Sequence, residues 1–288
     1  MFLHEVTPSL PRTTCHHGVS RLDLTQPQIM GILNMTPDSF SDGGHFFSVE
    51  AAVQRAVTMV EEGATLIDIG GESTRPGAAP VGVQEEIDRV IPVIEALRDK
   101  ISVPISVDTR KPEVMRAAVT AGAGFINDVN ALRAPEALEV AAQAGVPVCL
   151  MHMAGDPQNM QSKPVYQDVV GEVIAFLVAR INACVAAGIS RDKLIIDPGF
   201  GFGKTLQHNL SLLRRLDEFS TLGVPVLIGV SRKSILGALL DEPVPQQRVF
   251  AGAALAMYAL RKGVTLIRTH DVRATRDVMK VHAALNVF

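Results

Sequence analysis

The sequence predicts a single α/β domain folded as an eight-stranded (β/α)₈ barrel, the TIM-barrel architecture. Short apolar runs alternate eight times with amphipathic helical patterns after residue 28, which is typical of a parallel sheet. No change of composition divides these repeats into two domains, and 288 residues suit a fold that typically takes about 250. An open doubly wound sheet would alternate in the same way, but eight repeats favour closure into a barrel.

Each predicted strand is a short, mostly apolar run that leads into polar residues or glycine. The runs cover residues 29–33, 66–70, 105–107, 124–126, 147–151, 194–196, 225–230 and 265–267. Helical patterns fill the intervals at residues 49–62, 83–98, 135–144 and 165–187, and two further helices are expected to begin at Pro112 and near Leu206. After the seventh strand two helical pieces are separated by Pro243 and Pro245, and a last helix follows the eighth strand to the C-terminus. Ser48 occupies the N-cap position of the first helix and Gly63 follows its end, while Pro112 is well tolerated in a first helical turn.

Residues 1–28 form a weakly patterned N-terminal extension, and residues 29–288 form the barrel domain. We expect Leu22, Asp23, Leu24 and the turn before Pro27 to form a short hairpin that caps the floor of the barrel. The adjacent His16 and His17 have the chemistry of metal ligands, but a solvated pair near a terminus is the simpler interpretation.

Composition indicates a cytoplasmic protein that acts on small molecules. The net charge of −3 gives no support for a nucleic-acid or anionic-membrane partner. Cys15, Cys149 and Cys184 are odd in number and far apart, which favours reduced thiols. The N-terminus lacks the apolar segment of a signal peptide, and the apolar run at residues 249–260 is shorter than the roughly 18 residues that span a membrane.

Polar residues follow nearly every predicted strand. In a (β/α)₈ barrel the C-terminal ends of the strands meet at one mouth, where the chemistry takes place. The residues expected there are Asn34, Asp68, Asp108, Asn127, His152, Asp197, Lys233, Arg268 and His270. Two loops rich in turn-forming residues, 36–44 and 71–82, are expected to close over this mouth as lids.

The first chemical set at the mouth is Asp108, Asn127 and Asp197, with Lys233 close by. Carboxylates accept hydrogen bonds, lysine donates them and asparagine does both, which suits a flat heterocycle with an amino-amidine edge and a ring carbonyl. The alternative for each residue is a helix cap or a strand-end hydrogen bond, above all for Asn127 and its neighbour Asp128. Lys233 is also a candidate Schiff-base lysine, because Arg232 beside it could depress its pKa.

The second set is Asn34, Arg268 and His270, with Arg75 as a further candidate. Arg268 and His270 stand two apart on a strand and so are expected to face the same side, where they would bind an anion such as a phosphate group. The alternative is an ion pair at the barrel rim, for example between Arg268 and Asp38 or Asp271. The helix that begins at residues 231–234 offers free N–H groups for a carboxylate.

Together these motifs resemble the dihydropteroate synthase family, the folate-pathway enzymes that sulfonamides inhibit. The resemblance runs from about Leu22 to the C-terminus. It is carried by the blocks at residues 34–44, 71–77, 106–109, 126–128, 151–153, 197–204, 231–234 and 268–271. It implies a transferase that condenses 6-hydroxymethyl-7,8-dihydropterin diphosphate with 4-aminobenzoate to give 7,8-dihydropteroate and diphosphate, through a step in which the pterin methylene resembles a cation.

The resemblance also implies roles for residues, a magnesium ion and a homodimer. Asn34 matches a magnesium ligand, and the residues implied in catalysis are Asp108, Lys233, Arg268 and His270. The residues implied in contacts to the pterin are Asp108, Asn127, Asp197 and Lys233; to the diphosphate, Thr74, Asn34, Arg268 and His270; and to the aminobenzoate, Arg75, Pro76, Phe202 and Ser234. Residues 244–251 depart from the family pattern, which bears on the dimer interface.

Two other functions stay open at this point. A pterin-binding methyltransferase would share the barrel and the acids, but it needs neither the lid at residues 36–44 nor the anion pocket of Arg268 and His270. An inactive paralogue that binds pterin for regulation is expected to have lost a lid or anion residue, and the sequence retains them.

Overall fold

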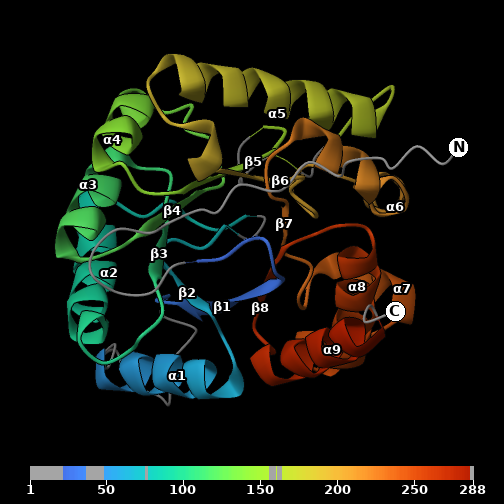
Figure 1. Cartoon of the computed structure of the whole chain (residues 1–288), viewed down its shortest axis with the longest axis horizontal. Helices are drawn as coiled ribbons and strands as arrows, with labels where there is room; N and C mark the ends of the chain where they lie inside the picture. Colours follow the sequence, from blue (N-terminus) through green and yellow to red (C-terminus); the bar gives the residue numbers. More distant parts are fainter. Residues whose placement is uncertain (1–21, 37–48, 75–76, 156–159, 161–163, 286–288) are drawn as a thin grey trace, which may run out of the picture.

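The computed structural model describes residues 22–36, 49–74, 77–155, 160 and 164–285. Within these residues eight parallel strands form one sheet in the order β6-β5-β4-β3-β2-β1-β8-β7. A bridge between Ile196 and Val226 joins the two outer strands, and Ile196 N donates to Pro225 O at 3.0 Å, so the sheet curls into a nearly closed barrel. The helices surround the strands (Figure 1), which confirms the predicted (β/α)₈ fold.

The elements alternate along the chain as predicted. The strands are β1 Gln28–Asn34, β2 Leu66–Gly70, β3 Ile105–Asp108, β4 Phe125–Asp128, β5 Val148–Met151, β6 Leu194–Asp197, β7 Leu227–Ile228 and β8 Leu266–Thr269. The α-helices are α1 Val49–Glu62, α2 Val83–Arg98, α3 Pro112–Ala121, α4 Ala137–Ala144, α5 Val169–Ala186, α6 Leu206–Arg214, α7 Ser234–Leu240, α8 Val249–Arg261 and α9 Val272–Leu285. Short 3₁₀ turns are η2 Arg191–Lys193, η3 Leu216–Leu222 and η4 Pro245–Arg248.

Several elements differ from the prediction at their ends, and two of these differences have a clear local cause. β7 has two residues rather than the six of 225–230, because Val226 is used in closing the barrel and Val230 already accepts a hydrogen bond from Lys233 N in the following turn. α4 begins at Ala137 rather than at residue 135, because the residue at its N-cap position, Glu136, has a φ of 64° that no right-handed helix accepts. Neither difference changes the order of the strands.

The barrel encloses a small apolar cluster at its lower end, separate from the larger core between strands and helices. Seven strand residues meet there with Leu22 and Leu24, which are 2% and 0% exposed. The strand residues are Met30, Leu66, Phe125, Cys149, Ile195, Leu227 and Leu266. Leu22 and Leu24 therefore close the floor of the barrel, as expected. The hairpin stays a prediction, because residues 1–21 lie outside the described part of the chain, and residues 22–27 contribute a turn.

Among the helices of the described residues, one has the length and composition of a membrane span. α5 has a mean hydropathy of 1.9 over its 18 residues, a run that the sequence reading of apolar segments overlooked. Its buried residues, among them Val173, Leu177 and Ile181, pack in the core, and a core helix of this kind passes the same test. Cys149 and Cys184 are free and buried, in agreement with the predicted reduced thiols, while Cys15 lies outside the described residues.

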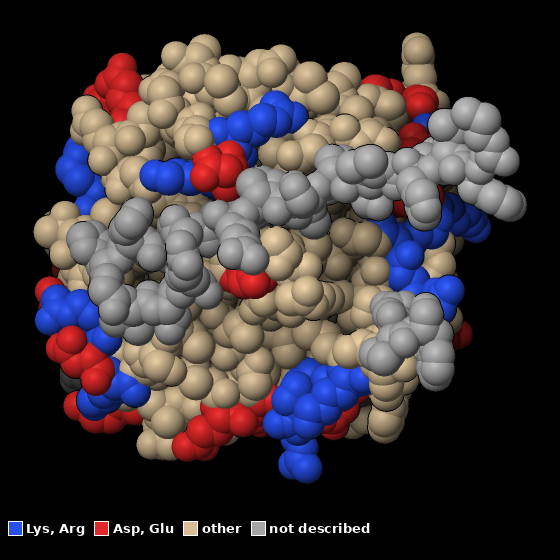
Figure 2. Space-filling model, viewed as in Figure 1, with Lys and Arg blue, Asp and Glu red and all other residues tan. Residues whose placement is uncertain are grey.

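Figure 2 shows one face of the molecule, in the same view as Figure 1. Lysine and arginine side chains alternate with aspartate and glutamate around its margin, and uncharged residues fill much of the area between them. Charges of both signs thus share this face, as the small net charge of −3 leads one to expect.

Candidate active site

Asp68 lies at the centre of the polar residues inside the barrel. It is the third residue of β2 and is fully buried. Its carboxylate accepts hydrogen bonds from Ser106 Oγ at 2.5 Å and from Asn127 Nδ2 at 3.0 Å. The parallel register sets Asp68 beside Ser106, which explains the first of these contacts. A buried carboxylate needs such donors to replace the water it has lost.

Arg268 on β8 joins Asp68 to Asp108. Its Nε donates to Asp68 Oδ2 at 2.6 Å, and its Nη2 donates to Asp108 Oδ2 at 2.8 Å. Burial lowers the pKa of Arg268, but the two carboxylates outweigh burial and raise this pKa, so the guanidinium stays charged. From the sequence, we expected Arg268 to form an anion-binding set with Asn34 and His270, and we call this set the basic corner. The structure instead places the Arg268 side chain among the acidic residues.

The basic corner therefore differs from the expectation. β8 ends at Thr269, so strand alternation does not fix the direction of His270. The backbone N of His270 donates to Ser231 Oγ at 3.1 Å, and its Nδ1 lies 3.2 Å from the same oxygen. Asn34 ends β1 in register with Gly70. The alternative ion pair of Arg268 with Asp271 is not formed, because Asp271 pairs with Arg232, and Asp38 lies outside the described residues.

Asp197 and Lys233 complete a cluster of polar residues with Asp68, Asp108, Asn127 and Arg268. We call this cluster the polar cup. Asp197 ends β6 and is 6% exposed, and its Oδ1 accepts a hydrogen bond from Gly199 N at 2.7 Å. Lys233 Nζ donates to Phe200 O at 2.6 Å and lies 4.6 Å from the centre of the Phe202 ring, within cation–π range. A Cβ on Gly229 would lie 3.8 Å from Arg268 Cδ and 3.9 Å from Lys233 Nζ, so Lys233 lies beside the arginine that binds Asp108, and the predicted heterocycle-binding residues converge.

Burial sets the protonation of this cup. It raises the pKa of Asp108 to about 7, with Arg268 opposing and Asp68 adding to the rise. It raises the pKa of Asp197 as well, against the attraction of Lys233. Burial, assisted by the positive charge of Arg268, lowers the pKa of Lys233 to about 8. The carboxylate of Asp197 acts in the opposite direction, because it favours the charged form of Lys233. The expected effect of Arg232 is not found, since that side chain pairs with Asp271.

A buried lysine, Lys204, binds backbone carbonyls of the loop between β6 and α6. Lys204 Nζ donates to Gly199 O at 2.9 Å and to Phe202 O at 3.0 Å, and it lies 2.9 Å from His152 Nδ1. Burial, assisted by the charge of Lys204, lowers the pKa of His152 to about 3, and burial lowers that of Lys204 to about 7. His152, expected at the mouth, is thus neutral and supports this loop.

Glycine is required in the same loop at Gly199. Its φ is +71°, and a Cβ there would lie 1.9 Å from His152 O, closer than any side chain can approach. The loop can therefore pass directly over the end of β5 and bring Phe200 and Phe202 to Lys233.

The base of the second lid is anchored by ion pairs. Glu72 lies two residues beyond β2, and its carboxylate accepts from Arg110 Nη2 at 3.2 Å and from Lys111 Nζ at 2.8 Å. Lys111 also pairs with the fully buried Glu86. Thr74 follows and is half-buried. Arg75 and Pro76, and all but Thr36 of the first lid at residues 36–44, lie outside the described residues.

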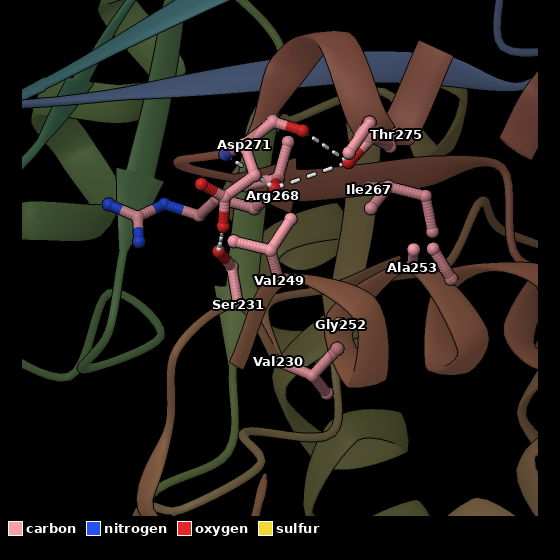
Figure 3. Close-up of a pocket in the computed structure, with 12 residues that line it drawn as sticks. Val230, Ser231, Val249, Gly252, Ala253, Ile267, Arg268, Asp271 and Thr275 are labelled. Atoms are coloured by element: carbon pink, nitrogen blue, oxygen red, sulfur yellow. Dashed lines mark hydrogen bonds between the residues drawn. The ribbon is translucent and has the colours of Figure 1, made fainter. Parts of the chain in front are cut away.

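A small cavity of about 10 Å³ behind β8, near α8 and α9, has no part in this cup. Figure 3 shows Ser231, Asp271 and Thr275 beside it, while the side chain of Arg268 extends away from it. The cavity has room for about one water molecule and is lined largely by small apolar side chains.

Comparison with known proteins decides the family. Residues 30–270 match the pterin binding enzyme family. The chain is 55% identical over 263 residues to the dihydropteroate synthase of Haemophilus influenzae, which covers 91% of this chain and 95% of that protein. The chain belongs to the dihydropteroate synthase family.

Solved structures of other family members share the fold. Xanthomonas albilineans dihydropteroate synthase with 4-aminobenzoic acid is 53% identical, has a TM-score of 0.92 and matches over 97% of this chain and 99% of that one. A structure of the enzyme from that organism with 7,8-dihydropteroate has a TM-score of 0.86 at 52% identity, over 93% and 96%. The Yersinia pestis dihydropteroate synthase in complex with a sulfonamide has a TM-score of 0.89 at 52% identity, over 93% and 98%.

Two residues of this family member show where reasoning from the sequence was incomplete. Asp68 was expected at the mouth but was given no role, although a carboxylate in the middle of an apolar strand was a signal that it needs buried partners. Asp128 is the turn-former that the alternative interpretation described, because its two carboxylate oxygens accept from Asn130 N and Leu132 N, each at 2.7 Å. Asn127 instead donates to Asp68.

Proposed function

We propose that the chain is a dihydropteroate synthase, a transferase of the folate pathway. It condenses 6-hydroxymethyl-7,8-dihydropterin diphosphate with 4-aminobenzoate to form 7,8-dihydropteroate and diphosphate. The observation that carries the proposal is the convergence of Asp108, Asn127, Asp197 and Lys233 on one cup, in a chain 55% identical to a known dihydropteroate synthase. The 4-aminobenzoic acid and 7,8-dihydropteroate bound to the Xanthomonas enzyme identify the second substrate and the product.

The pterin is proposed to bind across the floor of this cup. Asp197 accepts hydrogen bonds from the amino-amidine edge, and Lys233 donates to the ring carbonyl or a ring nitrogen. Asn127 and Asp108 hold the remaining polar edge. The orientation of Asn127 is supported by its hydrogen bond to Asp68, which fixes the amide nitrogen toward the strand and leaves the amide oxygen for the ligand.

The diphosphate group and the aminobenzoate are proposed to bind at the rim of the polar cup. Diphosphate is proposed to meet Thr74, Asn34, Arg268 and His270. A guanidinium has five N–H donors, and the bonds of Arg268 to Asp68 and Asp108 use two of them, which leaves donors for an anion. The aminobenzoate is proposed to lie between the second lid and the far side of the cup, in contact with Arg75, Pro76, Phe202 and Ser234.

The proposed reaction breaks one bond and forms one. The C–O bond between the pterin methylene and the diphosphate breaks, and its electron pair leaves with the diphosphate. Positive charge develops on the methylene carbon, where the carboxylate of Asp108 stabilises it. The nitrogen of the aminobenzoate then supplies its lone pair to that carbon and loses a proton. Closed lids exclude water, which would otherwise capture the carbon as an alcohol.

Magnesium is part of the proposal, with Asn34 as its protein ligand. The described residues contain no group of three or more His, Cys, Asp or Glu that would form a complete metal site. Mg²⁺ usually keeps several waters and is held by one or two carboxylates plus substrate phosphates, and the amide oxygen of Asn34 would supply an oxygen ligand in place of a carboxylate. When bound, it neutralises charge that the diphosphate gains as it leaves.

Three further properties are proposed with the activity. The buried free thiols of Cys149 and Cys184 suit a cytoplasmic enzyme. A homodimer is supported by exposed apolar residues on α7, α8 and the segment between them, among which Leu240 is 49% and Phe250 88% exposed. Inhibition by sulfonamides is proposed because the similar Yersinia enzyme binds one.

The test is a reaction of the purified protein with both substrates. Dihydropteroate is measured by chromatography and diphosphate by a coupled assay, with and without 4-aminobenzoate. Formation of both products in equal amounts supports the proposal. Pterin binding without diphosphate release would instead indicate an inactive pterin-binding paralogue, and methyl transfer to a corrinoid partner would indicate the methyltransferase.

A further inference from the structure

Arg248 is a buried arginine that binds backbone carbonyls. It ends the 3₁₀ turn η4, immediately before α8, and is 8% exposed. Its Nη1 donates to Arg232 O at 2.9 Å and Lys233 O at 3.1 Å. On the other edge of the same guanidinium, Nε and Nη2 donate to Glu242 O at 3.0 and 2.8 Å, and Nη2 also donates to Pro243 O at 2.8 Å.

A glycine in α7 makes room for this guanidinium. A Cβ on Gly237 would lie 2.5 Å from Arg248 Nη2, 2.7 Å from Arg248 Cζ and 2.9 Å from Glu242 O. Glycine destabilises a helix interior relative to alanine, so its presence here needs a reason. The packing of Arg248 across the helix supplies that reason.

Two of the four carbonyls that Arg248 binds, those of Arg232 and Lys233, belong to the turn that presents the Lys233 side chain. Arg232 adopts a left-handed φ of +59°, which is costly for a residue with a Cβ and persists only when its surroundings hold it. The side chain of Arg232 is held by Asp271 on one side, and its carbonyl by Arg248 on the other. Lys233 then directs Nζ into the cup, onto Phe200 O.

We propose that Arg248 is a positioning residue for pterin binding, which acts by fixing the backbone of Arg232 and Lys233 so that the ammonium of Lys233 meets the ligand. This inference rests on the role of Lys233 in the proposed function. It gives a role to Arg248, one residue of the stretch 244–251 whose departure from the family pattern had suggested a bearing on the dimer interface. Lysine cannot replace Arg248, because one ammonium cannot reach carbonyls on two edges of a planar fork.

The experiment compares variants that disturb Arg248 in different ways. Arg248→Lys keeps the charge, Arg248→Ala removes the side chain, and Gly237→Ala displaces a guanidinium that is still present. The matched control is Arg191→Lys, because Arg191 also donates to a backbone carbonyl, that of Leu222, but at the opposite end of the barrel. For each purified variant we measure the Kd for 6-hydroxymethylpterin by calorimetry, kcat and KM for both substrates, and Tm.

Arg248→Lys and Gly237→Ala are each expected to weaken pterin binding by about tenfold. This is the effect expected from losing one or two of the hydrogen bonds that hold the backbone of Lys233. Arg191→Lys is expected to bind pterin like the wild type. Guanidinium ion at low millimolar concentration is expected to restore pterin binding to Arg248→Ala, whereas sodium chloride at equal ionic strength does not. A purely structural role would lower Tm without this specific rescue.

The outcomes that overturn the proposal are distinct from those that overturn the proposed function. If Arg248→Lys and Gly237→Ala bind pterin within about twofold of wild type while Lys233→Met binds it weakly, Lys233 keeps its role and Arg248 has no positioning role. If Lys233→Met also binds pterin normally, the assigned role of Lys233 is wrong and the positioning proposal is wrong with it. A fall in Tm with unchanged pterin affinity would likewise limit Arg248 to stability.

Discussion

Replacing Asp68 by asparagine tests the central ion network directly. Asparagine has the same shape as aspartate. Its amide oxygen can accept the hydrogen bonds from Asn127 and Arg268, and its amide nitrogen can donate to the Ser106 hydroxyl, which then accepts a hydrogen bond instead of donating one. The substitution therefore removes a charge rather than a set of hydrogen bonds. Its effects then report on the electrostatics of the cup.

The expected loss of stability follows from the partners that remain. Removing one member of a buried ion pair costs roughly 3–5 kcal/mol when the other charge is left alone. Here Arg268 retains Asp108 at 2.8 Å, so the expected loss for Asp68→Asn is smaller, about 2–3 kcal/mol. Asp68→Ala would also leave three buried donors without an acceptor, and is expected to lose the full ~3–5 kcal/mol.

The same variant has a second, independent effect. The negative charge of Asp68 helps to raise the pKa of Asp108 to about 7. Without that charge the pKa of Asp108 is expected to fall, so the acid limb of kcat/KM for the pterin should move to lower pH. Stability is measured by urea unfolding at pH 7, and the limb by initial rates between pH 5 and 9, an interval that brackets the pKa of about 7.

The control is Asp217→Asn. Asp217 forms an exposed ion pair with Lys262 at 2.9 Å, for which a loss of only about 0–1 kcal/mol is expected. Equal losses for Asp68→Asn and Asp217→Asn, or an acid limb that stays in place or moves upward in Asp68→Asn, would refute the reasoning.

Three other predictions follow from the same contacts. In the wild type, kcat/KM for the pterin is expected to fall below about pH 7, where Asp108 gains a proton, and above about pH 8, where Lys233 loses one; a profile flat across this range would contradict both assignments. Lys204→Met leaves the acceptors Gly199 O, Phe202 O and His152 Nδ1 without their donor and is expected to cost about 2–4 kcal/mol in urea unfolding, whereas the surface variant Lys262→Met should leave the free energy of unfolding nearly unchanged. Asn34→Ala is expected to raise the Mg²⁺ concentration for half-maximal rate by about tenfold, and an unchanged titration would remove Asn34 as a ligand.

Periodicity and strand ends were enough to predict the barrel and most residues of the cup. Asp108 and Asp197 each end a strand and Asn127 is the last residue but one of β4, and parallel strands in one barrel bring their C-terminal ends together whatever the details of packing. The same logic could not predict that Arg268 would leave the basic corner. Its partner Asp68 lies 200 positions earlier in the chain, and their contact depends on β1 lying between β2 and β8 in the sheet.

Residues at strand ends and in turns were harder to predict than residues in the middle of strands, for a physical reason. Asn127 and Asp128 are adjacent and chemically alike, yet one faces Asp68 inside the barrel and the other accepts two backbone N–H groups of its own turn. Alternation along a strand separates them only once the strand's inner face is known. Arg248 illustrates the extreme case, because its acceptors are backbone carbonyls, which leave no mark in the sequence.

The charges of the cup match the transition state better than the substrate. Asp68, Asp108 and Asp197 supply three negative charges, and Arg268 and Lys233 supply two positive ones, so the fully ionised cup carries one excess negative charge in a largely buried space. Burial is the main cause of the raised pKa of Asp108, and the negative charge of Asp68 adds to it. A pterin methylene that becomes cationic as diphosphate leaves would neutralise the excess negative charge. The cup would then be least favourable when empty and most favourable at the moment the C–O bond breaks, which is what differential binding of the transition state requires.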